Sequence, residues 1–256
     1  MADARRDLTF LLAAPERRLL RAIAARLPVW ATSDQLTLLG VLGAVGCGVA
    51  YALSSLTAAW LAVASACLVV NWFGDSLDGT LARVRHAERP RYGYYLDHIV
   101  DAFATAAIGT GIGLSPYVDL SVALAVVLAY LVLSINVYLE TAAFGVFRLG
   151  YGRIGPTEAR LVLIGANTLL ALSTPGPLLT RIANWTLGLL VLGMLAAAAV
   201  RIAGNLSALA RLEPPQRRLT LRESPGRSET PRAPPLAGAF REWCAAGGGG
   251  TTGSAA

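Results

Sequence analysis

The stretch DSLDGTLARVRHAERPRYGYYLDHIVD, residues 75–101, places four aspartates at the edge of a long apolar run. At about 100° per residue, one side of a first helix would collect two acids, two small residues and an arginine: Asp75, Asp78, Gly79, Ala82 and Arg83. A second group repeats the pattern, because Gly93, Asp97 and Asp101 are spaced by four. The stretch therefore predicts two helices, joined by a short arginine-rich loop, whose acidic sides face each other.

The composition around this stretch is that of a membrane protein. The chain has 256 residues, of which 55% are hydrophobic and only 15% charged, and its mean hydropathy is +0.54. These values are too apolar for an ordinary soluble domain. We expect an all-α, polytopic membrane protein.

Apolar runs near the length of about 20 residues that crosses a bilayer predict six transmembrane helices. They lie at Leu36–Leu53, Leu56–Phe73, Ile99–Leu114, Leu120–Leu139, Leu161–Leu172 and Ile182–Val200. The third and fifth runs are short, so their helices should extend into polar sequence. For the third run this extension passes through Asp97 and Asp101.

Arginine placement predicts the orientation, because positive charge is retained on the cytoplasmic side of short loops. All 22 basic residues are arginine, and they cluster before the first run, after the second, after the fourth and after the sixth. Both termini and the acidic stretch are therefore expected at the cytoplasmic face, beside anionic membrane lipids. The absence of lysine and the high alanine content favour a bacterial protein of the inner membrane. No nucleic-acid motif accompanies the arginines, so a nucleic-acid partner is not expected.

Three regions are predicted. Residues 1–32 contain an amphipathic helix at the membrane interface, with Leu19, Leu20, Ile23 and Leu27 on one face; an ordinary surface helix is the alternative. Residues 33–205 form the six-helix catalytic domain. Residues 206–256 are rich in Pro, Arg, Ser and Gly and are expected to be a disordered cytoplasmic tail.

Four carboxylates at a membrane edge need a compensating cation. A charged side chain within the bilayer costs roughly 2.5–3.5 kcal/mol, and neighbouring carboxylates also repel one another. Hard divalent cations prefer oxygen ligands, and two Mg²⁺ or Mn²⁺ ions would balance the four acids. The metal ligands predicted in this way are Asp75, Asp78, Asp97 and Asp101. Arg83, beside them, suits bidentate binding of a phosphate.

The motif Asp75-x2-Asp78-Gly79-x2-Ala82-Arg83, followed by Gly93-x3-Asp97-x3-Asp101, resembles the signature of the CDP-alcohol phosphotransferase (CDP-alcohol phosphatidyltransferase) family. The resemblance implies six transmembrane helices, a homodimer, and transfer from a CDP-linked alcohol to a second alcohol with release of CMP. It also implies that Asp101 is the general base, and that the CDP and its diphosphate lie against four residues: Gly79, Ala82, Arg83 and Gly93.

The substrates are less tightly constrained. Four arginines at the cytoplasmic level lie in regions where family members hold a phosphorylated acceptor: Arg148, Arg153, Arg160 and Arg201. We expect CDP-diacylglycerol as donor and a small polar alcohol, either free or phosphorylated, as acceptor. The form DHIVD at Asp97–Asp101 also resembles choline and ethanolamine phosphotransferases, whose acceptor is diacylglycerol. A membrane prenyltransferase and a divalent-cation transporter are alternatives from other classes.

Overall fold

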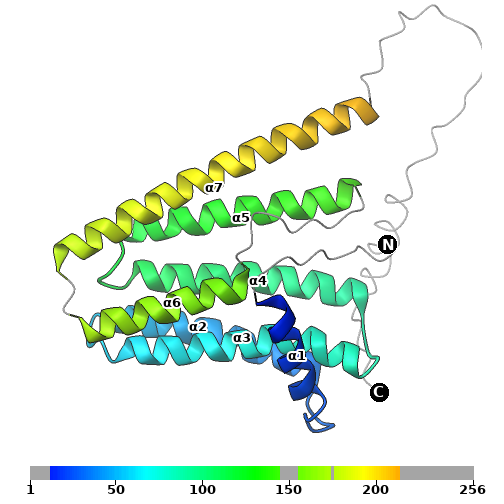
Figure 1. Ribbon diagram of the computed structural model, residues 1–256, viewed down its shortest axis with the longest axis horizontal. Helices are drawn as coiled ribbons and strands as arrows, with labels where there is room; N and C mark the ends of the chain where they lie inside the picture. The colour runs from blue at the N-terminus through cyan, green and yellow to red at the C-terminus, as the bar shows by residue number, and fades with distance from the viewer. Residues whose placement is uncertain (1–11, 145–154, 174–175, 214–256) are drawn as a thin grey trace, which may run out of the picture. The chain divides into compact units, whose positions relative to one another are not determined.

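A computed structural model describes residues 12–144, 155–173 and 176–213, and within these ranges the fold is helical with no strand (Figure 1). The helices are α1 (Ala13–Ala24), α2 (Ser33–Leu53), α3 (Trp60–Val84), α4 (Pro90–Gly113), α5 (Leu120–Phe144), α6 (Pro156–Leu172) and α7 (Pro177–Leu212). The all-helical prediction is confirmed for the described residues.

The helices agree closely with the apolar runs of the sequence. α4 begins at Pro90 and so carries Asp97 and Asp101 within it, as predicted from the short third run. Among the described residues, four helices are long and apolar enough to span a membrane, namely α2, α3, α5 and α7. These four helices identify an integral membrane protein. α4 and α6 fall short, since aspartates interrupt the apolar part of α4 and α6 has only 17 residues.

Local sequence signals explain where the helices begin. The Thr32 hydroxyl accepts the Gln35 backbone N–H at 3.2 Å, and the Gln35 side chain accepts the Thr32 N–H at 2.9 Å. This reciprocal arrangement caps α2. α4 and α6 each begin with a proline, Pro90 and Pro156, at the position where its missing N–H costs nothing.

Glycines bring the backbone of α2 close to two other helices. A Cβ atom at Gly43 would lie 2.6 Å from the backbone nitrogen of Asn71 in α3. A Cβ atom at Gly48 would lie 2.5 Å from the Ala107 carbonyl oxygen in α4. Gly74 in α3 meets the backbone of α2 in the same way. α2 is therefore the common neighbour of α3 and α4, which make few direct contacts with each other.

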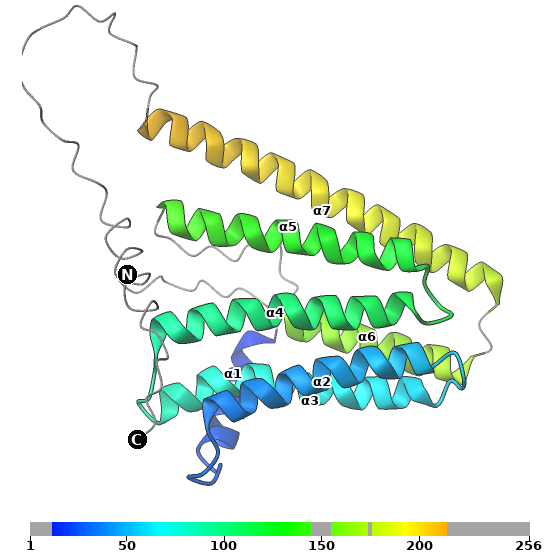
Figure 2. The same cartoon turned by 180° about the vertical axis from the view of Figure 1, so that it is seen from behind.

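The other helices pack around α2, α3 and α4 (Figures 1 and 2). α5 packs on α4, α7 packs on α5, and α6 packs on α3. α1 also packs on α3, where Leu20 and Ala24 join Leu77 and Leu81 in a buried cluster. Of the residues predicted on the apolar face of α1, Leu19 is the exception, because 52% of it is exposed.

One arginine fixes the turn before α2. The Arg85 guanidinium, just after α3, donates to the carbonyl oxygens of Leu27, Pro28, Val29 and Ala31, with a distance of 2.8 Å to Pro28. The chain between α1 and α2 is therefore bound to the end of α3.

Three predicted features lie outside the described residues. They are Arg148 and Arg153, in the segment 145–154, and residues 214–256 of the predicted tail. The last described helix, α7, continues to Leu212.

The close contact of α2 with α3 gives the first testable prediction. Gly74→Ala should lower the free energy of unfolding by about 1–3 kcal/mol, because the added methyl group meets backbone atoms of Gly40 and Leu36 that cannot move aside alone. Thermal unfolding in detergent measures the change. Gly193→Ala in α7 is the control, since no atom lies within 4 Å of the added Cβ. Equal loss of stability in both variants would contradict the packing argument.

Candidate active site

The four aspartates of the quoted stretch come from two helices and interact through space. Asp75 and Asp78 lie on α3, and Asp97 and Asp101 lie on α4. The Asp101 carboxyl interacts electrostatically with the other three, and Asp78 interacts with Asp75 and Asp97. Because α2 separates most of α3 from α4, the acids approach each other without direct packing of their helices.

Asp75 is held by an arginine of α6. The Arg160 Nη2 atom donates to Asp75 Oδ2 at 2.7 Å, and Arg160 Nε donates to the Asn71 Oδ1 atom at 3.0 Å. The Asn71 amide in turn donates to the Gly40 carbonyl of α2 at 2.9 Å. The side chains of Arg160 and Asp75 are only 14% and 21% exposed. Arg160 is thus the acceptor candidate that the structure places among the acids.

Asp78 is held from α2 and from its own helix. The Thr37 hydroxyl donates to Asp78 Oδ2 at 2.6 Å, and the Gly79 N–H donates to Oδ1. The Ser33 hydroxyl donates to the backbone carbonyl of Asp78 at 3.0 Å. The sequence did not identify Thr37, because a threonine forty-one positions from Asp78 carries no signal of its own.

α5 adds aromatic side chains to this region. Tyr130 and Tyr138 both interact electrostatically with Asp101. The His98 ring, beside Asp97, packs with its centroid 4.1 Å from that of Tyr94 and 4.4 Å from that of Tyr138. His98 therefore belongs to an aromatic cluster between α4 and α5.

The donor chemistry of the site fits a hard divalent cation. Four carboxylates act on one another, and Arg160 supplies a single positive charge to Asp75. Oxygen-only ligands of this kind suit Mg²⁺ and Mn²⁺. Within the described residues, however, no three acidic, histidine or cysteine side chains are already grouped at metal-binding distance. Asp75 is turned toward Arg160 and Asp78 toward Thr37, so metal binding would require these carboxylates to reorient.

The small residues of the motif leave open space instead of serving helix packing. A Cβ atom at Gly79 would meet only the Arg83 guanidinium, with the nearest atom at 3.4 Å, and a Cβ at Gly93 would meet nothing within 4 Å. Ala82 is half-buried. The glycines that serve close packing lie elsewhere, on α2, on α4 and at Gly74 of α3, so the space beside Gly79 and Gly93 is open to a bound ligand.

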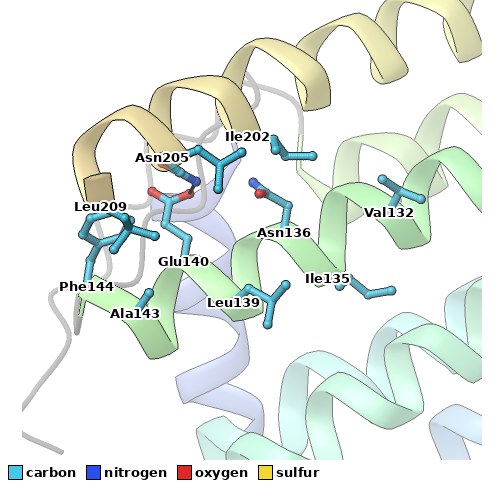
Figure 3. Close-up of a pocket in the computed structure, with 11 residues that line it drawn as sticks. Val132, Ile135, Asn136, Leu139, Glu140, Ala143, Phe144, Ile202, Asn205 and Leu209 are labelled. Carbon is cyan, nitrogen blue, oxygen red and sulfur yellow. Dashed lines mark hydrogen bonds between the residues drawn. The ribbon is translucent and has the colours of Figure 1, made fainter. Parts of the chain in front are cut away.

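Arg201 pairs with a glutamate of α5. Its Nε and Nη2 atoms donate to the two Glu140 carboxylate oxygens at 2.7 and 3.0 Å, and the Asn205 amide donates to the same carboxylate at 3.4 Å. Glu140 and Asn205 border an apolar cavity of about 330 Å³ between α5 and α7 (Figure 3). This ion pair joins α7 to α5.

Glu16 of α1 is a second polar centre that the sequence did not reveal. Its Oε1 atom accepts from Trp72 Nε1 at 2.7 Å, from the Thr157 hydroxyl at 2.8 Å and from the Ser76 hydroxyl at 3.3 Å. Trp72 and Ser76 lie on α3, whereas Thr157 lies in the first turn of α6. Glu16 therefore ties the start of α6, and with it Arg160, to α3.

The comparison with known families agrees with the aspartate geometry. The family model for CDP-alcohol phosphatidyltransferase matches residues 30–203, which is more than half of the 256-residue chain. The chain therefore belongs to the CDP-alcohol phosphatidyltransferase family. No individual curated protein matches it.

The Glu140–Arg201 pair gives a prediction about stability. Glu140→Leu or Arg201→Leu alone should each cost about 3–5 kcal/mol, because the remaining charge is left buried without its partner. The double variant should recover much of this loss, since it removes both charges from the α5–α7 contact. Unfolding free energies of the four proteins in mixed micelles measure the coupling.

The matched control is Arg181→Leu, which removes an exposed arginine from the same helix and should change stability little. Additive effects of the two single substitutions would contradict a direct interaction between Glu140 and Arg201.

Proposed function

We propose that this member of the CDP-alcohol phosphatidyltransferase family transfers a phosphatidyl group from CDP-diacylglycerol to a small polar alcohol and releases CMP. The observation that carries the proposal is that the Asp101 carboxyl interacts electrostatically with Asp75, Asp78 and Asp97, four aspartates in the spacing of the family signature within the matched residues 30–203. Membership of the family implies a CDP-alcohol as substrate. CDP-diacylglycerol as the donor and a small polar alcohol as the acceptor are part of our proposal.

The proposed enzyme crosses the membrane six times, with α4 and α6 completing the set begun by the four long apolar helices. Both helices support this arrangement by packing on spanning neighbours, α4 on α2 and α5, and α6 on α3. Arginine placement then favours cytoplasmic termini and a cytoplasmic active site, in a bacterial inner membrane. We place α1 at the interface on the same side, and by family likeness we expect a homodimer.

Asp75, Asp78, Asp97 and Asp101 are the proposed ligands of two Mg²⁺ or Mn²⁺ ions. When bound, such ions would neutralise the donor diphosphate and the negative charge that develops on its oxygens. Asp78 would turn away from the Thr37 hydroxyl, and Asp75 from Arg160, to reach the ions. The space beside Gly79, Ala82 and Gly93 would accept the CDP group, as the open surroundings of both glycines support.

Asp101 is the proposed general base. In the reaction, the acceptor oxygen forms a bond to the phosphorus that carries the lipid, and the bond from that phosphorus to the CMP oxygen breaks. The acceptor proton passes to the Asp101 carboxylate. Asp101 supports this role by its position, because it interacts with the three other aspartates and with Arg160.

Arg160 is the proposed contact for the acceptor. Its guanidinium is bound to Asp75 and Asn71, and a phosphorylated acceptor would compete with Asp75 for it. Arg201 would have to leave Glu140 to play the same part. We therefore propose Arg160 before Arg201, and Arg148 and Arg153 remain predictions from the sequence.

Release of CMP tests the proposed reaction directly. Purified protein in lipid micelles with CDP-diacylglycerol and Mg²⁺ should release CMP when the right acceptor is added, and EDTA should stop it. Inositol phosphate, glycerol phosphate, inositol and serine are tested in parallel. CMP release with CDP-choline and diacylglycerol, but with none of these acceptors, would move the protein to the choline and ethanolamine branch.

Aspartate variants test the proposed roles. Asp101→Asn should lower kcat by about 10²–10⁴-fold, as expected for loss of a general base, and should retain binding of CDP. Asp75→Asn, Asp78→Asn and Asp97→Asn should abolish turnover and also weaken metal binding, measured by titration of Mn²⁺. Asp119→Asn, at an exposed aspartate before α5, is the control. Full activity of Asp101→Asn would show that the base is another group.

A further inference from the structure

A second cavity lies between α1 and the last turn of α3, and its lining is strongly basic. It has a volume of about 290 Å³ and is lined by Arg17 and Arg21 of α1 and by Thr80, Arg83 and Val84 of α3. Three of the five lining residues are arginines, and none is acidic. The cavity therefore concentrates positive charge at one place on the surface.

Apolar packing forces these arginines together. Leu20 and Ala24 anchor α1 on Leu77 and Leu81 of α3 in a buried cluster. Arg17 and Arg21, four positions apart, therefore stand on the same side of α1, opposite Arg83. Like charges four positions apart on a helix destabilise it, so the cluster gains stability when an anion lies among its members.

Local hydrogen bonds orient the lining. Arg17 Nε donates to the Ala13 carbonyl at 3.0 Å. The Thr80 hydroxyl donates to the Ser76 carbonyl at 3.0 Å and accepts from Arg83 Nη2 at 3.2 Å. Arg83 is thus directed along the surface of α3 toward α1. Guanidinium groups fixed in this manner match the tetrahedral oxygens of a phosphate.

Part of the cavity lining lies on the side of α3 opposite the candidate active site. At about 100° per residue along α3, Thr80 and Val84 lie on the side of the helix opposite Asp78. Arg83 stands between the two regions, because its guanidinium also lies beside Gly79. Arg17 and Arg21 belong to the cavity alone and have no part in the proposed reaction.

We propose that this cavity is a binding site for a phosphate group at the membrane surface, held by Arg17, Arg21 and Arg83. The phosphate is that of an anionic lipid headgroup or of a soluble phosphate compound, because both present the same oxygens to the arginines. The site goes beyond the proposed transfer reaction and does not depend on it.

The test uses two probes that separate the sources. The full chain in an uncharged detergent is titrated with dihexanoyl phosphatidic acid or with inorganic phosphate, in EDTA so that the aspartates hold no metal, and thermal unfolding is recorded. Arg17→Gln/Arg21→Gln is compared with Arg18→Gln/Arg26→Gln, which removes the same charge from exposed arginines outside the cavity. A cooperative unfolding transition recorded without any probe verifies that each variant is folded.

We expect at least one probe to raise the Tm of the wild type and of the control variant. In Arg17→Gln/Arg21→Gln the apparent Kd should rise roughly tenfold or more, the effect of losing charge-assisted hydrogen bonds. A response to phosphatidic acid alone assigns the site to a lipid headgroup, and a response to both probes assigns it to phosphate in general.

Equal weakening in both double variants would overturn the proposal, because it would mean that only overall charge attracts the probe. The absence of any response in the wild type would overturn it as well. If the double variant does not fold, Arg17→Gln and Arg21→Gln are tested singly against Arg18→Gln.

Discussion

The close approach of α2 to both α3 and α4 is the constraint on which the candidate site depends. Gly43 and Gly48 allow backbone contacts that no side chain would permit. Because α3 and α4 each pack on α2 and make few direct contacts with one another, the glycines of α2 set how these two helices, and the four aspartates they carry, are placed.

Polar contacts at two positions along α6 then fix this helix to α2 and α3. Near the aspartates, Arg160 binds Asp75 and Asn71. Further along α6, the Asn167 side chain accepts from the Tyr51 hydroxyl and donates to the Ser65 hydroxyl, both at 3.0 Å. Buried polar pairs add little net stability but penalise any arrangement that separates them. Their effect here is to fix the rotation of α6 and hence the direction of the Arg160 guanidinium.

The sequence predicted the features that repeat along a single helix. It did not predict the contacts between side chains of different helices. Spacing alone indicated that a helix runs through Asp97 and Asp101, and α4 does so. The four aspartates were predicted to meet, and they interact. Thr37, Glu16 and Glu140 were not identified, because each acts through a partner more than forty positions away. Periodicity describes one helix at a time, whereas such pairs depend on how two helices are rotated against each other.

The arginines illustrate why charge counting is insufficient. The preference for cytoplasmic positive charge explains where they occur along the chain, but their contacts divide them into different kinds. Arg160 and Arg201 are paired with carboxylates inside the helical bundle, and Arg85 binds the carbonyls of the turn before α2. Arg17 and Arg21 instead share a basic cavity with Arg83. Topology would be satisfied by any arginine on that side of the membrane, whereas the grouping of these three follows from the packing of α1 on α3 and forms the proposed phosphate site.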